Sequence, residues 1–297
     1  MSEEKVSKLK DYLTSYLFII PAVLLFSVFS IYPIFKILQL SLLKWDGISL
    51  YPKFVGLKNF IEVIKDKIWW KSFLNAGIIT LLALTVQNAL ALVLAIIVDK
   101  DIRAGEIYRV IFYIPPVLSG IVVGLIWNWI YNYDYGFLNH FLEVIGLGGL
   151  KRAWLSDPKL ALFSVAVVHM WKGFGWGFII FLAGLQTIPR NLYEAAQIDG
   201  ATPWKTFLHV VVPMMRPVFF LVSILTILGT MQIYDIIVAT TGGGPGYATE
   251  VPITRILSSM LGSSRFGYAC AEGLIFGVVL LAVSLIQLRI SAMMRNE

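Results

Sequence analysis

The sequence is poor in cysteine, histidine and charged residues. Only one of its 297 residues is Cys (Cys270) and three are His, so an intramolecular disulfide and a multi-thiolate metal site are excluded. Charged residues make up 14% of the chain, whereas soluble domains carry roughly 25%. Hydrophobic residues reach 58% and the mean hydropathy is +0.78. These values exclude an ordinary soluble domain and a disordered chain.

The hydrophobic residues gather in six blocks, each long enough to cross a bilayer. A span needs about 20 mostly apolar residues, and it must be helical because lipid offers no hydrogen-bond partner to an open backbone. The sequence therefore predicts an all-α polytopic membrane protein with six transmembrane helices. The predicted segments are an N-terminal tail (1–13), six spans (14–34, 74–98, 110–130, 161–185, 217–239 and 268–288) and a C-terminal tail (289–297).

The basic residues do not decide the orientation in the membrane. The net charge of +6 fits basic loops beside a bilayer better than nucleic-acid binding. Lys and Arg are slightly denser on the side of the N-terminus, but the first loop on the other side is also rich in lysine. The positive-inside rule therefore gives only weak support to a cytoplasmic N-terminus.

The loop between the fourth and fifth spans, 186–216, has the pattern of two short helices. Gly200 predicts a left-handed residue at the end of the first helix, and Thr202 predicts the N-cap of the second. Trp204 and Phe207 lie on one side of the second helix, with no evident partner inside so short a loop. This leaves two interpretations: an amphipathic hairpin on lipid, or a docking element for a soluble partner.

The same loop resembles the EAA loop of ABC importer permeases. The residues that carry the resemblance are Glu194-Ala195-Ala196 and Asp199-Gly200-Ala201. Three other segments are similar to maltose-type carbohydrate-uptake permeases, and the last of them resembles the first of the two permeases in such systems. These segments are Phe54–Phe60, Trp171–Gly173 with Leu182–Gln186, and Thr241–Pro245.

The resemblance implies a type I ABC importer permease fold. It implies a cytoplasmic EAA loop whose coupling helix sits in a cleft of an ATPase subunit, and therefore cytoplasmic N- and C-termini. The implied coupling residues are Glu194, Ala195, Ala196, Asp199, Gly200 and Ala201. The implied partners are a second homologous permease, two ATPase subunits, an extracytoplasmic solute-binding protein and a carbohydrate, at a prokaryotic cytoplasmic (inner) membrane.

The sequence has no Walker A segment of the form G-x-x-x-x-G-K-[ST]. We therefore expect no cofactor in this chain, ATP and Mg²⁺ on the partner ATPase subunits, and transport by alternating access without enzymatic activity of its own. The glycine run Gly242–Gly246 lacks the lysine of a phosphate-binding loop and is interpreted as a turn between spans.

Three ionisable residues, Lys172, Asp235 and Glu272, fall inside predicted spans. Such residues are costly in lipid and usually face the bundle interior or a cavity. For Lys172 two interpretations stay open: an internal ion pair or carbonyl contact, and direct contact with substrate.

A candidate substrate path follows from the fourth and fifth spans. His169, Gly173 and Trp176 recur at helical spacing on one face, which fits either a sugar site or helix packing. Gln87 and Asn88 are expected to form interhelical hydrogen bonds instead. In the fifth span, Gly229, Gln232 and Tyr234–Asp235 lie at the level where the resembled family builds its sugar site. The whole candidate path is His169, Lys172, Gly173, Trp176, Gly229, Gln232 and Asp235.

Other functional classes fit less well. An ABC importer for a non-sugar solute stays an alternative. An intramembrane serine protease needs a paired Ser and His, and His169 is the one intramembrane His, without a Gly-x-Ser-x-Gly segment. A stand-alone channel or secondary transporter needs no docking loop, and the spans show no clear inverted repeat.

Overall fold

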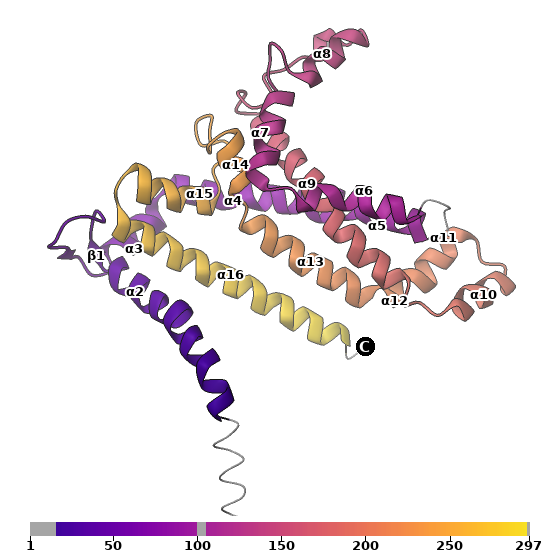
Figure 1. Ribbon diagram of the computed structural model, residues 1–297, viewed down its shortest axis with the longest axis horizontal. Helices are drawn as coiled ribbons and strands as arrows, with labels where there is room; N and C mark the ends of the chain where they lie inside the picture. The colour runs from indigo at the N-terminus through magenta and orange to yellow at the C-terminus, as the bar shows by residue number, and fades with distance from the viewer. Residues whose placement is uncertain (1–15, 100–104, 296–297) are drawn as a thin grey trace, which may run out of the picture. The chain divides into compact units, whose positions relative to one another are not determined.

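The computed structural model describes residues 16–99 and 105–295 (Figure 1). The predicted N-terminal tail, the first two residues of the first predicted span, residues 100–104 and the last two residues of the C-terminal tail lie outside the described residues. Nearly every described element is a helix, in keeping with the predicted all-α class. The chain divides into two units, residues 1–65 with 256–276 and residues 66–255 with 277–297.

The first unit contains the first long helix, which runs over Tyr16–Ser41 and therefore past the predicted end at residue 34. A short antiparallel hairpin follows, and α3 is fixed to it by one side chain. The amide of Asn59 donates to the carbonyl oxygens of Ser41 (2.7 Å) and Leu43 (2.9 Å). The elements are η1 (Ser27–Ile31), α2 (Tyr32–Ser41), β1 (Leu43–Lys44), β2 (Lys53–Phe54), α3 (Lys58–Lys65), η5 (Ser258–Gly262) and the start of α16 (Phe266–Arg295).

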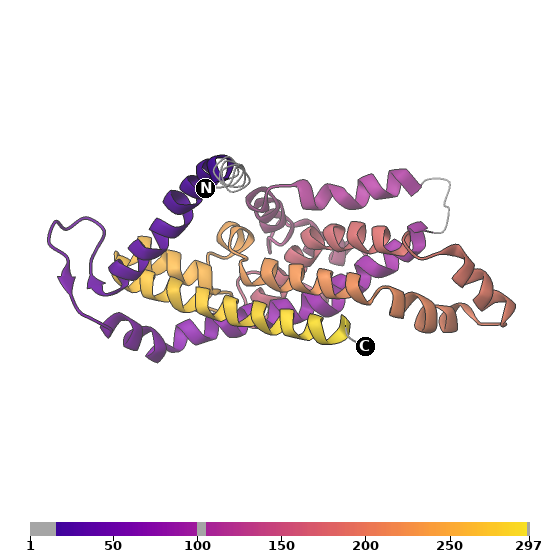
Figure 2. The ribbon, with the colours of Figure 1, turned by 90° about the horizontal axis from the view of Figure 1, so that it is seen from below.

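The second unit is built around α9, which lies against α5, α6 and α13 (Figures 1 and 2). Helix α9 has the bounds predicted for the fourth span, 161–185. The elements are α4 (Lys67–Leu82), η2 (Ala83–Gln87), α5 (Asn88–Asp99), α6 (Gly105–Val117), α7 (Gly120–Ile130), α8 (Phe137–Val144), η3 (Gly148–Leu150), α9 (Ala161–Leu185), α10 (Arg190–Ile198), α11 (Pro203–Thr206), η4 (Phe207–Val211), α12 (Val212–Met214), α13 (Arg216–Met231), α14 (Asp235–Thr240) and α15 (Pro252–Leu257), whose last residues belong to the first unit.

Two apolar cores lie on opposite ends of α9. One joins α4, α7, α9 and α14 and includes Ile79, Val123, Val165 and Ile237. The other joins α5, α9 and α13 to the loop after α9 and includes Phe178, Leu185, Ile188, Val211 and Met215. The loop helices are thus packed into the same core as the spans.

The third predicted span is not one continuous helix, so this expectation is wrong. It divides into α6 and α7, which meet at 94°. Pro115 and Pro116 lie at the end of α6, and Ser119 then takes an extended conformation. A proline at this position removes a backbone donor, which favours a break in the helix there.

The fifth predicted span is also interrupted. Helix α13 ends at Met231, and α14 begins only at Asp235. The turn between them allows Ile233, Ile236 and Ile237 to become buried in the first core. The burial of these side chains therefore accounts for the break between α13 and α14, which the apolar sequence does not reveal. Within residues 16–99 and 105–295, four helices are long and apolar enough to cross a membrane. The number rises to as many as six if each bent pair, Gly105–Val117 with Gly120–Ile130 and Pro203–Met214 with Arg216–Met231, counts as one span.

Polar side chains join α13 to the second predicted span. The hydroxyls of Thr80 and Thr230 lie 2.7 Å apart. The Asn88 amide donates to the Thr226 hydroxyl at 3.2 Å, which confirms the predicted interhelical role of Asn88. Such bonds hold helices together where no hydrophobic force acts between them.

The contact between α6 and α9 depends on Gly175. A Cβ at this position would overlap the Phe112 carbonyl oxygen and lie 2.7 Å from Cγ of Pro116. We expect Gly175→Ala to destabilise the protein by about 1–3 kcal/mol, because backbone atoms must move apart. Gly77→Ala, whose new methyl group would meet nothing within 4 Å, is the matched control. Thermal unfolding in detergent measures both, and equal midpoints would contradict the close approach.

Candidate functional site

The first loop helix, α10, ends as the sequence predicts. Gly200 adopts a positive φ of 71°. Its N–H donates to the carbonyl of Gln197 (3.0 Å), and the N–H of Ala201 donates to the carbonyl of Ala196 (2.9 Å). These bonds satisfy the last carbonyls of the helix, as in a left-handed C-cap. No atom lies within 4 Å of a Cβ built on Gly200, so its backbone conformation alone requires glycine.

The second loop helix begins at the predicted cap. The Thr202 hydroxyl accepts from the backbone N–H of Lys205 (3.4 Å), and Pro203 occupies the first turn. The rings of Trp204 and Phe207 stack with their centroids 5.5 Å apart. Trp204 is 67% exposed, so this apolar face lies on the surface of the described chain.

The six candidate coupling residues divide by exposure. Glu194, Ala195, Asp199 and Gly200 are exposed, whereas Ala196 is buried and Ala201 is half-buried. Both carboxylates are therefore accessible to another protein. Leu192 and Tyr193, which pack against the second core, hold α10 to the rest of the second unit.

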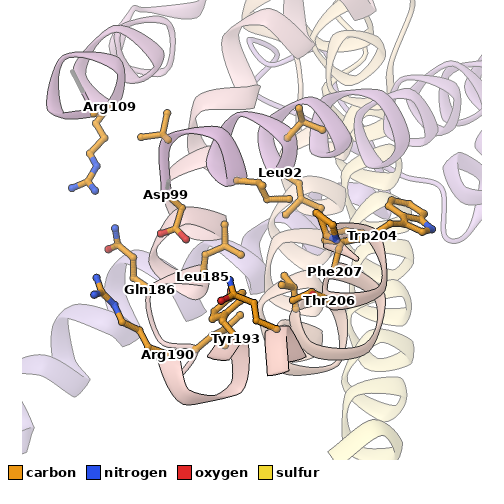
Figure 3. A pocket seen from close by; sticks show the side chains of 18 of the residues that line it. Leu92, Asp99, Arg109, Leu185, Gln186, Arg190, Tyr193, Trp204, Thr206 and Phe207 are labelled. Carbon is orange, nitrogen blue, oxygen red and sulfur yellow. The ribbon is translucent and has the colours of Figure 1, made fainter. Parts of the chain in front are cut away.

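A cavity of about 1540 Å³ lies between the loop helices and the ends of α5, α6 and α9. Figure 3 shows Leu92 and Phe207 on one side of it and the charged side chains of Asp99, Arg109 and Arg190 on the other. Burial and the nearby charge of Asp99 raise the pKa of the Tyr193 hydroxyl, so this residue stays a neutral hydrogen-bond donor on the cavity wall.

Three of the predicted substrate-path residues come from two helices that pack together. His169 and Lys172 lie three positions apart on α9, and α14, which begins at Asp235, contacts α9. The Asp235 carboxylate accepts from the N–H of Ile236 (2.8 Å) and lies against Gly120, where a Cβ would overlap it. Lys172 and Asp235 are half-buried, and Glu272 is fully buried. Sequence reasoning missed Gly120, because nothing in an apolar run marks a glycine as the neighbour of a distant carboxylate.

The other predicted path residues differ in their surroundings. Gly173 packs against η2, since a Cβ there would lie 2.8 Å from the Oε1 of Gln87. Trp176 is 54% exposed and meets the ring of Tyr113 edge-on at 5.4 Å. On α13, Gly229 has open space beside it and Gln232 is exposed. Gly173 therefore takes the packing role that was one of its two interpretations.

The glycine run after α14 forms a turn with many hydrogen bonds. The Thr249 hydroxyl donates to the carbonyl of Gly244 at 2.7 Å, and the Asn75 amide of α4 donates to the carbonyl of Glu250 at 2.8 Å. The Glu250 carboxyl is buried against Gly243, and its Oε1 has no hydrogen-bond partner in the described chain. The sequence predicted the turn but not the buried acid within it.

The fold matches that of ABC importer permeases. A crystal structure of the bacterial alginate ABC transporter, in complex with an alginate pentasaccharide-bound periplasmic protein, superposes with a TM-score of 0.81 at 22% identity, covering 95% of this chain and 94% of that chain. The resemblance at this identity concerns the fold. The shared fold is that of a protein with several membrane-spanning helices.

The family follows from sequence. The model for the binding-protein-dependent transport system inner membrane component matches residues 87–296, and the chain belongs to this family. The probable ABC transporter permease YurN of Bacillus subtilis is 36% identical over 92% of this chain and 94% of its own length. The trehalose/maltose transport system permease MalF of Thermococcus litoralis is 30% identical over the whole length of both chains. The chain is thus a multi-pass membrane permease and not an enzyme.

The burial of Glu250 predicts a pH-dependent stability. Desolvation raises the pKa of this carboxyl above its usual value of 4.5, although Thr254 and Arg255 oppose the shift. A group whose folded pKa is raised stabilises the folded state at low pH, and this contribution is lost as the pH rises through the folded pKa. We expect Glu250→Gln to match the wild type below pH 4.5 and to unfold at a higher temperature than the wild type near neutral pH.

Thermal unfolding between about pH 4 and pH 8 tests this expectation. Glu143→Gln is the control. Lys151 lowers the pKa of Glu143, so we expect this variant to be less stable than the wild type near neutral pH, the opposite of the result expected for Glu250→Gln. A Glu250→Gln variant that is less stable than the wild type near neutral pH would show that the ionised carboxylate is favoured in the folded state.

Proposed function

We propose that this chain is the first of two homologous permease subunits in an ATP-driven importer of a sugar or oligosaccharide. The observation that carries the proposal is the loop hairpin α10–α12, which offers exposed side chains at its outer surface and is buried in the span core at its base. The transport systems named for the relatives, for trehalose/maltose and for alginate, support a carbohydrate as the solute.

In this proposal α10 is the coupling helix that docks into an ATPase subunit. Glu194 is exposed and pairs with a basic group on that subunit. Ile198 (86% exposed) and Trp204 (67% exposed) supply the apolar contact. Clustered exposed apolar side chains are typical of a protein interaction surface.

Motion of the ATPase subunits reaches the spans through the second core. Ile188 and Val211 at the base of the hairpin pack with Phe181 and Leu185 of α9, so the hairpin and α9 move together. Alternating access then requires two arrangements of the spans, selected by the nucleotide state of the ATPases. ATP and Mg²⁺ bind to two separate ATPase subunits, because this chain has no Walker A segment.

A cytoplasmic coupling loop determines the orientation. Four spans precede the loop and two follow it, so the N- and C-termini are both cytoplasmic. An extracytoplasmic solute-binding protein delivers the sugar at the opposite face, in agreement with the description of the family.

The substrate path includes His169 and Lys172 of α9, Asp235 of α14 and the exposed ring of Trp176. Sugar hydroxyls need polar partners, and sugar C–H faces stack on aromatic rings. The second permease subunit completes the path, because these side chains are only partly enclosed within this chain.

Substitutions in α10 and at its C-terminus test the coupling role. We expect Glu194→Ala and Gly200→Val to lose ATPase co-purification or transport-stimulated ATP hydrolysis. A β-branched residue in the left-handed conformation of Gly200 costs at least about 1–2 kcal/mol, which displaces the helix end. Gly200→Asn should keep more than half of the activity, since Asn tolerates this conformation.

Asp134→Ala, which removes an exposed carboxylate from a different loop, is the control for charge loss. The measurements are co-purification with the ATPase and ATP hydrolysis in the same samples. If the wild type transports solute but binds no ATPase, the chain is a stand-alone transporter and the proposal fails.

A further inference from the structure

The hairpin of the first unit encloses a small groove that no role above uses. We name it the hairpin groove; it has a volume of about 490 Å³. Its walls come from the hairpin, from α3 and from the start of α16, all within one unit. The residues that carry the argument are Lys44, Asp46, Lys53, Lys58, Glu62 and Arg265.

Both acidic residues of the hairpin groove already have partners. The Glu62 carboxylate forms an ion pair with Arg265. The Asp46 carboxylate accepts from the backbone N–H groups of Ile48 (3.0 Å) and Ser49 (2.7 Å), which lower the pKa of Asp46 to about 2. The carboxylates of Glu62 and Asp46 are therefore engaged in these contacts and do not neutralise the lysines of the groove.

The lysines of the groove carry an uncompensated positive charge. Lys44, Lys53 and Lys58 are all exposed, and none forms an ion pair with another residue in the part of the chain that the structure describes. The guanidinium group of Arg265 lies 4.0 Å from the centroid of the Tyr268 ring. The result is a concave basic surface.

Apolar side chains surround this basic surface. The turn between β1 and β2 exposes Ile48 (87%), Leu50 (88%) and Tyr51 (88%), and Phe54 in β2 is 74% exposed. Single exposed apolar residues are common, but a contiguous group on one hairpin marks a contact site. Protein interfaces combine apolar and aromatic contact area with polar and charged side chains.

We propose that the hairpin groove and the exposed turn dock an acidic surface of the extracytoplasmic solute-binding protein. This inference rests on the proposed function, which places the loop after the first span outside the cell. The lysines attract carboxylates of the partner and accelerate its encounter, and the apolar turn contributes contact area once the two proteins meet.

The alternative occupant of this surface is the lipid headgroup region, and Asp46 argues against it. Its carboxylate is kept ionised at the base of the turn by two backbone N–H groups. Insertion of the turn would carry this charge into apolar lipid, which disfavours a charged group. A concave groove also fits protruding side chains better than it fits a flat membrane surface.

Charge reversal tests the proposal. The probe is the purified solute-binding protein of the same transport system, added to the complete importer in nanodiscs of phosphatidylcholine. We expect Lys53→Glu/Lys58→Glu to raise the Kd about tenfold or more at low salt and to weaken its dependence on NaCl. The control is Lys67→Glu/Lys159→Glu, which reverses two exposed lysines outside the groove and should change the Kd less than about twofold.

A fluorescent label distinguishes the two occupants. Leu50→Cys in a Cys270→Ser background is labelled with an environment-sensitive dye in the complete importer. A blue shift on addition of the binding protein supports docking. A blue shift without the binding protein, stronger in phosphatidylglycerol than in phosphatidylcholine, assigns the turn to the membrane and overturns the proposal.

Two results distinguish a wrong docking site from a wrong assignment as an importer. If the wild-type importer binds the solute-binding protein and both double variants bind it equally well, the groove is not the docking site and the importer assignment stands. If the wild type binds an ATPase but no solute-binding protein at any salt concentration, the import function itself fails, and the docking proposal fails with it.

Discussion

The close packing of α9 against its neighbours is the constraint on which the second unit depends. Three glycines allow it: Gly175 lies against the backbone of α6, Gly177 against Ala91 of α5, and Gly184 against Val218 of α13. Between helices in lipid, van der Waals contact and hydrogen bonds replace the hydrophobic effect as the source of association. Side chains at these positions would therefore remove the main attraction between the spans.

This packing also connects the two functional regions. Helix α9 carries His169 and Lys172 in its middle and ends at Leu185, at the base of the loop hairpin. The separation is about 16 residues from His169 to Leu185, or roughly 24 Å at the rise of an α-helix. A continuous helix transmits displacement over that distance without a chain of intermediate side chains. The proposed coupling and the proposed substrate path therefore share one element.

Features that depend on local chemistry followed from the sequence. The left-handed Gly200, the cap at Thr202 and the bounds of α9 each depend on a few neighbouring residues. The break after Met231 did not follow, because apolar blocks look alike whether the helix inside them is straight or bent. The break at Ser119 had a local signal in Pro115 and Pro116, which the prediction of an unbroken span overlooked. Of the candidate substrate residues, His169 and Lys172 lie on α9 and Asp235 begins α14, which contacts α9, whereas Gly173 packs against η2.

The sequence by itself determined the class of protein, because the hydrophobic content and the length of its apolar blocks require membrane-spanning helices. It also indicated the family, since the motif residues of the loop after the fourth span, Glu194–Ala196 and Asp199–Ala201, form two short runs within eight positions. Only the tertiary structure decided which polar residues meet. Three contacts join residues that lie far apart along the chain. They are Asp235 against Gly120, Thr80 with Thr230, and Asn59 with the end of the first helix. Local spacing carries no information about such contacts, because they depend on how whole helices pack.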